Sequence, residues 1–469
     1  MMRLENFAQE IFNQKLSAEK TVETTNKRQP VHVVYGGANL FRADTPRKLG
    51  EIALKFLHKY APNFVEFAKA MSMPNAEALN ADEKSINTLQ DKLIENPEAV
   101  KRENFHAWLA WAVYHRTIEK LKKEPVEDFR IDFEDGYGFR PDNEEDLHAI
   151  SASNELANSI ATNQAPAFCG FRIKSFSKET FKRAVRTLDL FLSNFIEKTN
   201  ANLPENFVVT LPKIRYAEEV EVLAALLKKI EENYQIKTNT IKIEVIIETP
   251  ESIIGKDGRI ALHRIVEAGE ERVVAAHFGA FDYTASLGIS GIHQDLKHEV
   301  CNFARQLMQV ALSPLGIRLS DSVTIQMPIP PHKGENLLPA QMLENKTIVQ
   351  QAWQKHFRNI SFSLSNGFYQ SWDLHPAQLV ARYAAVYTFF LQSLEEQAKR
   401  LKNFIQKATQ ASLTGNIFDD AASANGLLNF FRQAINCGAL EENEIKAVTD
   451  LSMEEILSYT FSEIVEKRK

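Results

Sequence analysis

The chain has 469 residues, of which 44% are hydrophobic and 25% charged, a composition typical of a globular protein and not of a disordered one. Its formal net charge of -6 leaves no basic excess to neutralise phosphate groups, which argues against nucleic acid and acidic membrane surfaces as partners. The three cysteines, Cys169, Cys301 and Cys437, are widely separated and have no CxxC spacing, so they indicate neither a disulfide framework nor a structural zinc site.

The first 30 residues are charged and amphipathic, and we expect a helical segment here. They contain none of the apolar stretch that a secretory signal needs. No apolar run elsewhere approaches the roughly 20 residues that a membrane span requires. A cytoplasmic protein is therefore expected, without nucleic acid or membrane as a partner.

Short runs of β-branched and apolar residues alternate with longer segments of helical periodicity, as in chains of βα units. The strands predicted in this way are 31–35, 129–133, 167–173, 207–211, 241–247, 272–278, 317–321 and 360–364. Eight such units favour an α/β fold in which the parallel strands close into a TIM (β/α)8 barrel over residues 31–376. An open, doubly wound sheet is the alternative.

Two helical regions accompany the predicted barrel. Residues 46–123, between the first and second strands, form an insertion far longer than an ordinary connection, and their pattern is helical. After residue 376 the pattern is helical throughout, so residues 377–469 are predicted to form a C-terminal helical region or lid.

Polar residues gather where the predicted strands end. In a barrel these carboxyl ends meet at one mouth, where such proteins carry their active sites. The strand-end residues with chemically useful side chains or main-chain amides are Glu134, Asp135, Arg172, Lys174, Lys213, Glu248, Gly279, Ala280 and Asp282.

Glu248 and Asp282 follow neighbouring strands. Mg²⁺ prefers carboxylate oxygen and typically takes one or two carboxylates, while substrate and water complete its coordination. We therefore interpret the pair as ligands of Mg²⁺, with Mn²⁺ as the second candidate. The alternative is that each residue only caps the helix that follows it, because acidic residues are common in first turns.

Arg172 and Lys213 end apolar strands, so each charge needs a partner in the mouth. A planar guanidinium grips carboxylates bidentately, so Arg172 could orient an acidic substrate. Lys213 could neutralise Glu134 or Asp135, and we favour this structural role. A Schiff-base aldolase with Lys213 as nucleophile is an alternative that leaves the two acidic strand ends without a role.

These motifs, in this order, resemble the citrate lyase beta-subunit and malyl-CoA lyase group, within the HpcH/HpaI aldolase and malate synthase-like superfamily. The group's patterns DLED, VRxN, PKxE, IETP and GxxDY, followed by an IHP element, are similar to residues 132–135, 171–174, 212–215, 247–250, 279–283 and 374–378. Lys174 stands where the group has asparagine, and Arg215 where it has glutamate. These departures, the insertion and the tract 367–372 indicate a divergent, longer branch.

The resemblance implies a TIM barrel in which Glu248 and Asp282 bind Mg²⁺ and Arg172 binds a 2-oxo acid. The further substrate-binding residues predicted at the strand ends are Lys213, Gly279 and Ala280. The implied activity is that of a carbon–carbon lyase or aldolase, which acts on a 2-oxo acid, a hydroxy acid or a CoA thioester through a metal-stabilised enolate. A homo-oligomer, trimeric or hexameric, is also implied.

Glu134 and Asp135 join Arg172 as predicted catalytic residues. The resemblance also implies a separate proton acceptor from the C-terminal region, where Asp420 is the candidate base and a helix N-cap is the simpler alternative. Two other functions stay open at this stage. One is phosphoryl transfer or isomerisation on phosphoenolpyruvate, and the other is a non-catalytic barrel that serves as a binding protein.

Overall fold

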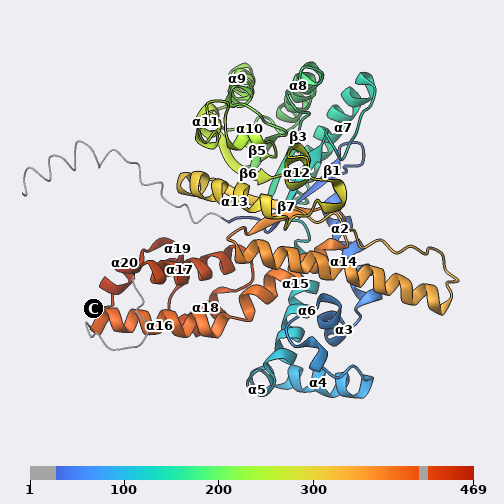
Figure 1. Cartoon of the computed structure of the whole chain (residues 1–469), viewed down its shortest axis with the longest axis vertical. Helices are drawn as coiled ribbons and strands as arrows, with labels where there is room; N and C mark the ends of the chain where they lie inside the picture. Colours follow the sequence, from blue (N-terminus) through green and yellow to red (C-terminus); the bar gives the residue numbers. More distant parts are fainter. Residues whose placement is uncertain (1–27, 411–420, 469) are drawn as a thin grey trace, which may run out of the picture.

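The computed structural model describes residues 28–410 and 421–468, and its centre is a closed barrel of eight parallel strands (Figure 1). The strands are β1 (His32–Gly37), β2 (Asp128–Asp132), β3 (Phe168–Arg172), β4 (Phe207–Leu211), β5 (Lys242–Ile247), β6 (Val273–Phe278), β7 (Arg318–Val323) and β8 (Gln370–Asp373). Each strand pairs in parallel with the next, and β8 closes the barrel on β1. The predicted TIM barrel is confirmed, and the open sheet is excluded.

Helices surround the barrel and extend beyond it. In chain order they are α2 (Thr45–Tyr60), α3 (Phe64–Met71), α4 (Glu83–Glu95), α5 (Pro97–Glu103), α6 (Phe105–Lys123), α7 (Asp142–Ala161), α8 (Phe181–Lys198), α9 (Ala217–Asn233), α10 (Pro250–Ile253), α11 (Leu262–Ala268), α12 (Ala280–Ser286), α13 (Glu299–Leu312), α14 (Pro339–Ser365), α15 (Gln378–Leu391), α16 (Leu394–Gln410), α17 (Ala421–Asn436), α18 (Glu442–Thr449), α19 (Met453–Ser458) and α20 (Phe461–Glu466). Short 3-10 helices cover Ala76–Ala78, Gly291–His293 and Ser313–Leu315. In Figure 1, α7 to α11 lie above α14 and α15, α3 to α6 lie below them, and α16 to α20 lie to their left.

The helices between β1 and β2 begin at local capping residues. The side chains of Asn63, Asp82, Asn96 and Asn104 each accept a hydrogen bond from the main-chain N–H three residues later. Such caps satisfy one of the N–H groups that the first turn leaves free. The short helices α3 to α6 therefore start at positions that the local sequence specifies.

Outward-facing strand residues pack against amphipathic helices. Phe171 of β3 stacks on Phe191 of α8, with ring centroids 4.0 Å apart. Helix α8 buries residues that recur at intervals of three or four, which is the helical period that its sequence predicts. This packing holds β3, and with it the polar residue at the end of that strand.

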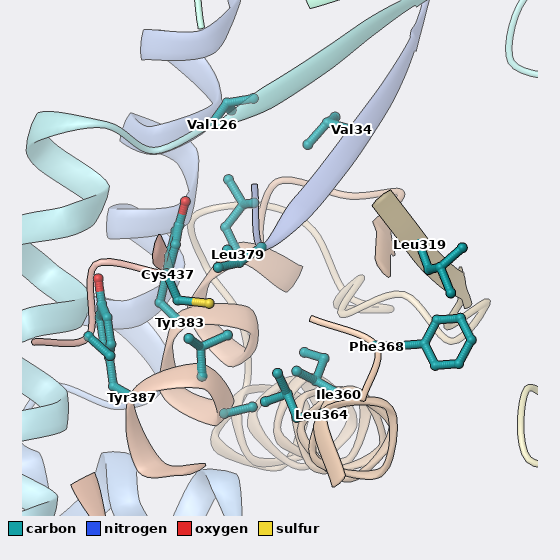
Figure 2. Close-up of a cluster of buried hydrophobic side chains, with 14 of the residues drawn as sticks. Val34, Val126, Leu319, Ile360, Leu364, Phe368, Leu379, Tyr383, Tyr387 and Cys437 are labelled. Atoms are coloured by element: carbon teal, nitrogen blue, oxygen red, sulfur yellow. The ribbon is translucent and has the colours of Figure 1, made fainter. Parts of the chain in front are cut away.

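The apolar core continues from the barrel into the C-terminal helices. Figure 2 shows Val34 and Leu319 of the barrel near Leu364 of α14, Tyr383 of α15 and Cys437, which follows α17. All five belong to one cluster of apolar residues, and all are buried. The described helices beyond β8 therefore share a continuous core with the barrel.

Seven of the eight predicted strands agree with the structure to within two residues, but the strand predicted at 360–364 is wrong. Those residues lie in α14, where Phe357, Ile360 and Leu364 are buried at helical spacing. Burial along one face of a long helix produced an apolar run that resembles a strand.

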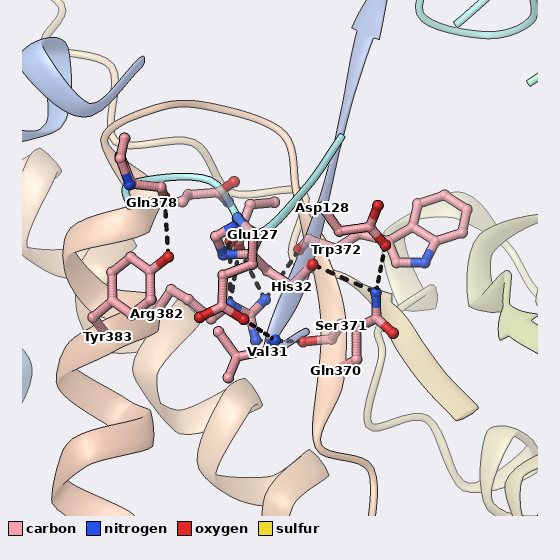
Figure 3. Close-up of polar contacts among 12 residues, drawn as sticks. Val31, His32, Glu127, Asp128, Gln370, Ser371, Trp372, Gln378, Arg382 and Tyr383 are labelled. Carbon is pink, nitrogen blue, oxygen red and sulfur yellow. Dashed lines mark hydrogen bonds and ion pairs between the residues drawn. The ribbon is translucent and has the colours of Figure 1, made fainter. Parts of the chain in front are cut away.

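The eighth strand is β8, whose sequence QSWD has no apolar run. Its polar side chains are nevertheless buried and have partners (Figure 3). Gln370 Nε2 donates to Asp128 Oδ2 at 3.1 Å, and Arg382 Nη1 donates to Ser371 Oγ at 2.7 Å. Because hydrogen bonds offset the cost of burying these groups, β8 can be polar and central at once.

The described residues bear on membrane spans and on the state of the cysteines. In that part of the chain, no helix has both the length and the apolar character that a membrane span requires. Cys169, Cys301 and Cys437 are buried and form no disulfide. Burial also raises the pKa of the Cys169 thiol to about 12, which keeps it protonated at neutral pH.

Candidate active site

A cavity of about 320 Å³ lies at the carboxyl ends of the strands. Its lining residues lie in the last part of seven of the eight strands or shortly after them: Tyr35, Asp132, Asp135, Gly136, Arg172, Glu248, Gly279, Phe281, Asp282, Ser322, Val323, Ile325, Trp372 and Leu374. Among the predicted site residues, the cavity brings together Arg172, Asp135, Glu248, Gly279 and Asp282. They are far apart in sequence, and the closed barrel places them around one space.

Glu248 follows β5 and is only 2% exposed. Its Oε1 accepts a hydrogen bond from the main-chain N–H of Lys213 at 2.6 Å. Gly279 leaves room for this carboxylate, because a Cβ atom there would lie 2.5 Å from Glu248 Oε2. Burial, together with the negative charge of Asp282, raises the pKa of Glu248 well above its usual value. Among the described residues, no lysine or arginine forms an ion pair with Glu248.

Asp282 lies in the first turn of α12 and is exposed to solvent. Its carboxylate forms no hydrogen bond or ion pair with another described residue. It caps no N–H of α12, and the helix after Glu248 is capped by the side chain of Thr249, which accepts from Ser252 N. The geometry therefore does not support helix capping as the role of either carboxylate.

Arg172 is bound tightly by a residue that the sequence analysis did not assign to the site. Its Nε and Nη2 donate to the two carboxylate oxygens of Asp132 at 2.7 and 2.6 Å. The remaining nitrogen, Nη1, lies 3.2 Å from Glu134 Oε2 and 3.6 Å from Asp135 Oδ2. The guanidinium also lies 4.7 Å from the centroid of the Tyr35 ring. Only Nη1 is therefore free of the bidentate pair with Asp132.

Lys213 follows β4 in a left-handed conformation, with φ of 54°. Its ammonium group contacts Glu134 Oε1 and Asp135 Oδ1, the latter at 2.9 Å. Burial opposes the charged form, but the two carboxylates outweigh it and raise the pKa of Lys213. A lysine that stays protonated is a poor nucleophile, so this geometry favours a counter-ion over a Schiff base.

Glu134 and Asp135 are adjacent, but their environments differ. Burial raises the pKa of Glu134. Burial would also raise that of Asp135, but Arg172 and Lys213 outweigh it and lower the pKa of Asp135. Neighbouring carboxyl groups whose pKa values are driven apart are typical of sites that transfer protons.

The other predicted residues lie as follows. Gly279 lines the cavity, but its N–H donates to Ile247 O at 3.0 Å. The N–H of Ala280 donates to Ser322 Oγ at 3.0 Å, and Ala280 is not among the residues that line the cavity. Both main-chain N–H groups therefore donate to acceptors within the protein. Asp420 lies outside the described residues.

Tyr35 also lines the cavity and is not among the site residues that the sequence predicts. Tyr35 Oη lies 3.3 Å from His277 Nδ1 and 3.4 Å from Glu244 Oε1, inside the barrel. Arg130 donates to the same glutamate, through Nη2 at 2.6 Å. A signal for this interior was present, because Asp128, Arg130 and Asp132 alternate along β2 and so share one face.

The residues present fit a divalent cation at Glu248 and Asp282. Within residues 28–410 and 421–468, no group of three or more His, Cys, Asp and Glu side chains is arranged to hold a metal. Mg²⁺ needs only one or two carboxylates, however, because water and substrate supply its other ligands. A buried carboxylate without a cation partner, next to an exposed one with no partner, provides that donor set.

Comparisons with known proteins match the chain to one family model and to solved structures. A family model described as "Domain of unknown function (DUF6986)" matches residues 13–464. No curated protein matches the sequence. A citrate lyase from Burkholderia xenovorans LB400 is 17% identical and has a TM-score of 0.51, with 72% of this chain and 92% of that chain covered. A Haloferax volcanii malate synthase, solved as a magnesium/glyoxylate complex, is 14% identical, with a TM-score of 0.39 and coverage of 72% and 87%.

Proposed function

We propose that this chain, which belongs to the DUF6986 family, is a carbon–carbon lyase or aldolase that uses a divalent cation and acts on a small 2-oxo acid. The observation that carries the proposal is the pair Glu248 and Asp282, which lacks a cation partner among the described residues and shares a cavity with Arg172. A buried, unpaired carboxylate costs folding free energy. Its position at the carboxyl end of barrel strands is typical of a functional site.

Glu248 and Asp282 would hold the cation, which is Mg²⁺ or Mn²⁺. When bound, such a cation draws electron density from the oxygens of a 2-oxo acid and stabilises the negative charge of its enolate form. Arg172 lines the cavity and would orient the acid through Nη1, the one guanidinium nitrogen that the pair with Asp132 leaves free. Apolar side chains such as Val323 and Trp372 limit the access of water to this space.

Glu134 is the residue that we assign to proton transfer. It is not among the residues that line the cavity, but it is adjacent to Asp135, which does, and its Oε2 lies 3.2 Å from Nη1 of Arg172. In the cleavage of a 4-hydroxy-2-oxo acid, its carboxylate accepts the proton of the hydroxyl group. The neighbouring C–C bond then breaks, its electron pair passes to the 2-oxo acid fragment, and an aldehyde leaves. That fragment takes up a proton at the same carbon. Lys213 positions Glu134 through their ion pair, and burial raises the pKa of Glu134 toward the range useful for acid–base catalysis.

Exchange of the methyl protons of pyruvate for deuterium tests this function without knowledge of the full substrate. In D2O with Mg²⁺, the protein is expected to accelerate the loss of the methyl signal in proton NMR spectra, and EDTA is expected to stop it. D257N is the matched control for substitutions of Glu248 and Asp282, because Asp257 is an exposed carboxylate that does not line the cavity. Its exchange rate should equal that of the unaltered protein. Absence of exchange, together with no release of pyruvate from 4-hydroxy-2-oxo acids, would refute the proposal.

A further inference from the structure

A second cavity, of about 310 Å³, adjoins the site cavity on the side of β6 and β7. Phe281, Val323 and Ile325 line both cavities and so form the boundary between them. The side chain of Ile325 is 55% exposed, so few packing contacts hold it in that boundary. The two cavities are therefore neighbours, and one of the three side chains between them is largely exposed.

The lining of the second cavity is polar but electrically balanced. Its two charged side chains belong to Asp295 and Lys355, and they form an ion pair with 2.6 Å between Oδ2 and Nζ. The other carboxylate oxygen of Asp295 accepts a hydrogen bond from Lys297 N at 2.8 Å. Because these charges offset each other, the cavity favours an uncharged polar group over an ion.

A chain of hydrogen bonds determines how Asn359 is oriented at this cavity. Burial lowers the pKa of His356, so the ring is neutral at pH 7 and has a single N–H. That N–H is on Nε2, because its partner at 2.6 Å is Oδ1 of Asp373, a carboxylate oxygen that can only accept. His356 Nδ1 must then accept, and the Thr324 hydroxyl, 2.9 Å away, donates to it.

Thr324 Oγ1 in turn accepts from Asn359 Nδ2 at 3.0 Å. A swap of the amide would bring two acceptors together, so the amide nitrogen must face Thr324. Asn359 is 3% exposed, and its Oδ1 is buried without a donor among the described residues. Buried acceptors of this kind are rare, because the lost hydration is not replaced.

We propose that the second cavity is a subsite that binds an uncharged hydrogen-bond donor, a hydroxyl or amide group, at the end of the substrate remote from its 2-oxo acid. This inference rests on the proposed function, since the 2-oxo acid occupies the neighbouring site cavity. The hydroxyl or amide N–H donates to Asn359 Oδ1. The substrate class is therefore a 2-oxo acid whose carbon chain carries a further polar, uncharged group.

Substituted oxamates test the subsite, because oxamate is the stable amide analogue of pyruvate and cannot form an enolate or be cleaved. N-(2-hydroxyethyl)oxamate and N-propyloxamate differ only by a hydroxyl in place of a methyl group. Calorimetric titration in the presence of Mg²⁺ is expected to show the hydroxyl compound binding about tenfold more tightly, because the methyl group leaves Oδ1 unsatisfied. The 3-hydroxypropyl and butyl pair extends the test to a longer chain.

Three variants show whether Asn359 is responsible. N359L removes the acceptor at similar volume and is expected to abolish the preference while oxamate itself binds as before. T324V releases the Asn359 amide from its fixed orientation and is expected to weaken the preference. S363A is the matched control, because Ser363 lies one turn further along α14, is buried and does not line the cavity. S363A should prefer the hydroxyl compound as strongly as the unaltered protein does. Thermal melting shows whether each variant folds.

The outcomes separate this inference from the proposed function. If oxamate binds but both members of each pair bind equally, the subsite is refuted while the proposed function stands. If neither oxamate nor its derivatives bind with Mg²⁺, the binding of 2-oxo acids fails, and the subsite fails with it. A hydroxyl preference that N359L leaves intact would also refute the assignment to Asn359.

Discussion

Glu248 and Asp373 are both fully buried carboxylates of the same barrel, yet the fold treats them in opposite ways. Glu248 accepts one main-chain N–H, forms no ion pair with a described residue, and has a pKa raised by burial and by Asp282. Asp373, at the end of β8, accepts from Arg382 Nη2 at 2.8 Å and from His356 Nε2 at 2.6 Å. Burial opposes its charge, but Arg382 and His356 outweigh it and lower the pKa of Asp373.

The barrel interior below the cavity follows the pattern of Asp373. Arg130 contacts both Asp128 and Glu244 there, and all three are buried. A charge that serves only the fold is given partners, because an unpaired one would cost several kcal/mol. Among the buried carboxylates of the described residues, Glu248 is the one without a cation partner, and it lies in the mouth, where a ligand can supply the missing charge. Replacement of a carboxylate by an amide should therefore reduce activity in the mouth but stability in the barrel interior.

The largest effect is expected in the mouth. E248Q and D282N should each lower the rate of pyruvate proton exchange by about 10³-fold or more, because each removes half of the cation's carboxylate donors. E248Q should at the same time keep or raise the melting temperature, since it relieves the cost of burying a charge without a partner. NMR exchange rates and thermal melting measure the two effects. A large fall in melting temperature for E248Q would contradict the view that the buried Glu248 carboxylate costs folding free energy.

The matching change in the paired region should act on stability. D373N leaves the buried Arg382 guanidinium without its carboxylate and is expected to lower the free energy of unfolding by about 3 to 5 kcal/mol. Asp373 does not line the site cavity, so exchange per folded molecule should stay close to that of the unaltered protein. Chemical denaturation measures this cost. Unchanged stability would show that the pairing of Asp373 contributes little.

A smaller effect should appear as a dependence of stability on pH. Burial lowers the pKa of His32 from 6.5 to about 4, even though Asp373 lies 3.3 Å away. Between these values the unfolded chain binds a proton that the folded chain does not, so this contribution is complete above pH 6.5 and is lost as the pH falls toward 4. The shift corresponds to about 3 kcal/mol.

Denaturation curves at several pH values test this dependence. The variant H32Q should flatten the curve of unfolding free energy against pH between 6.5 and 4, because glutamine binds no proton in either state. His356 changes in the same direction, since burial lowers its pKa too, and should leave part of the slope. An identical slope in H32Q would exclude His32 as a source.

The strands that sequence patterns located are those with apolar outward faces. Phe171 and Val209 pack against helices, and such residues alternate or run together in a way that single-sequence patterns detect. Strand β8 was not predicted, because it buries polar groups whose partners come from β1, β2 and α15. Partners this remote in sequence leave no local pattern.

The site residues also divide into those that local sequence patterns indicate and those that depend on partners remote in sequence. The pattern of polar strand ends indicated Arg172, Glu248 and Asp282, and the barrel brings them to one cavity. The commitment of Arg172 to Asp132 and the position of Tyr35 beneath it could not be read from the sequence. Each depends on which side chain faces inward on a neighbouring strand, and hence on the register of the barrel.

The sequence by itself determined that the chain would form βα units, because the periods of its apolar residues distinguish strands from helices without reference to any partner. It also determined which charged residues end those strands. Only the tertiary structure decided which of these charges are neutralised. Glu248 and Asp373 are chemically alike. Their difference arises because the packing of α14 and α15 against β8 brings His356 and Arg382 to Asp373, whereas no lysine or arginine among the described residues pairs with Glu248.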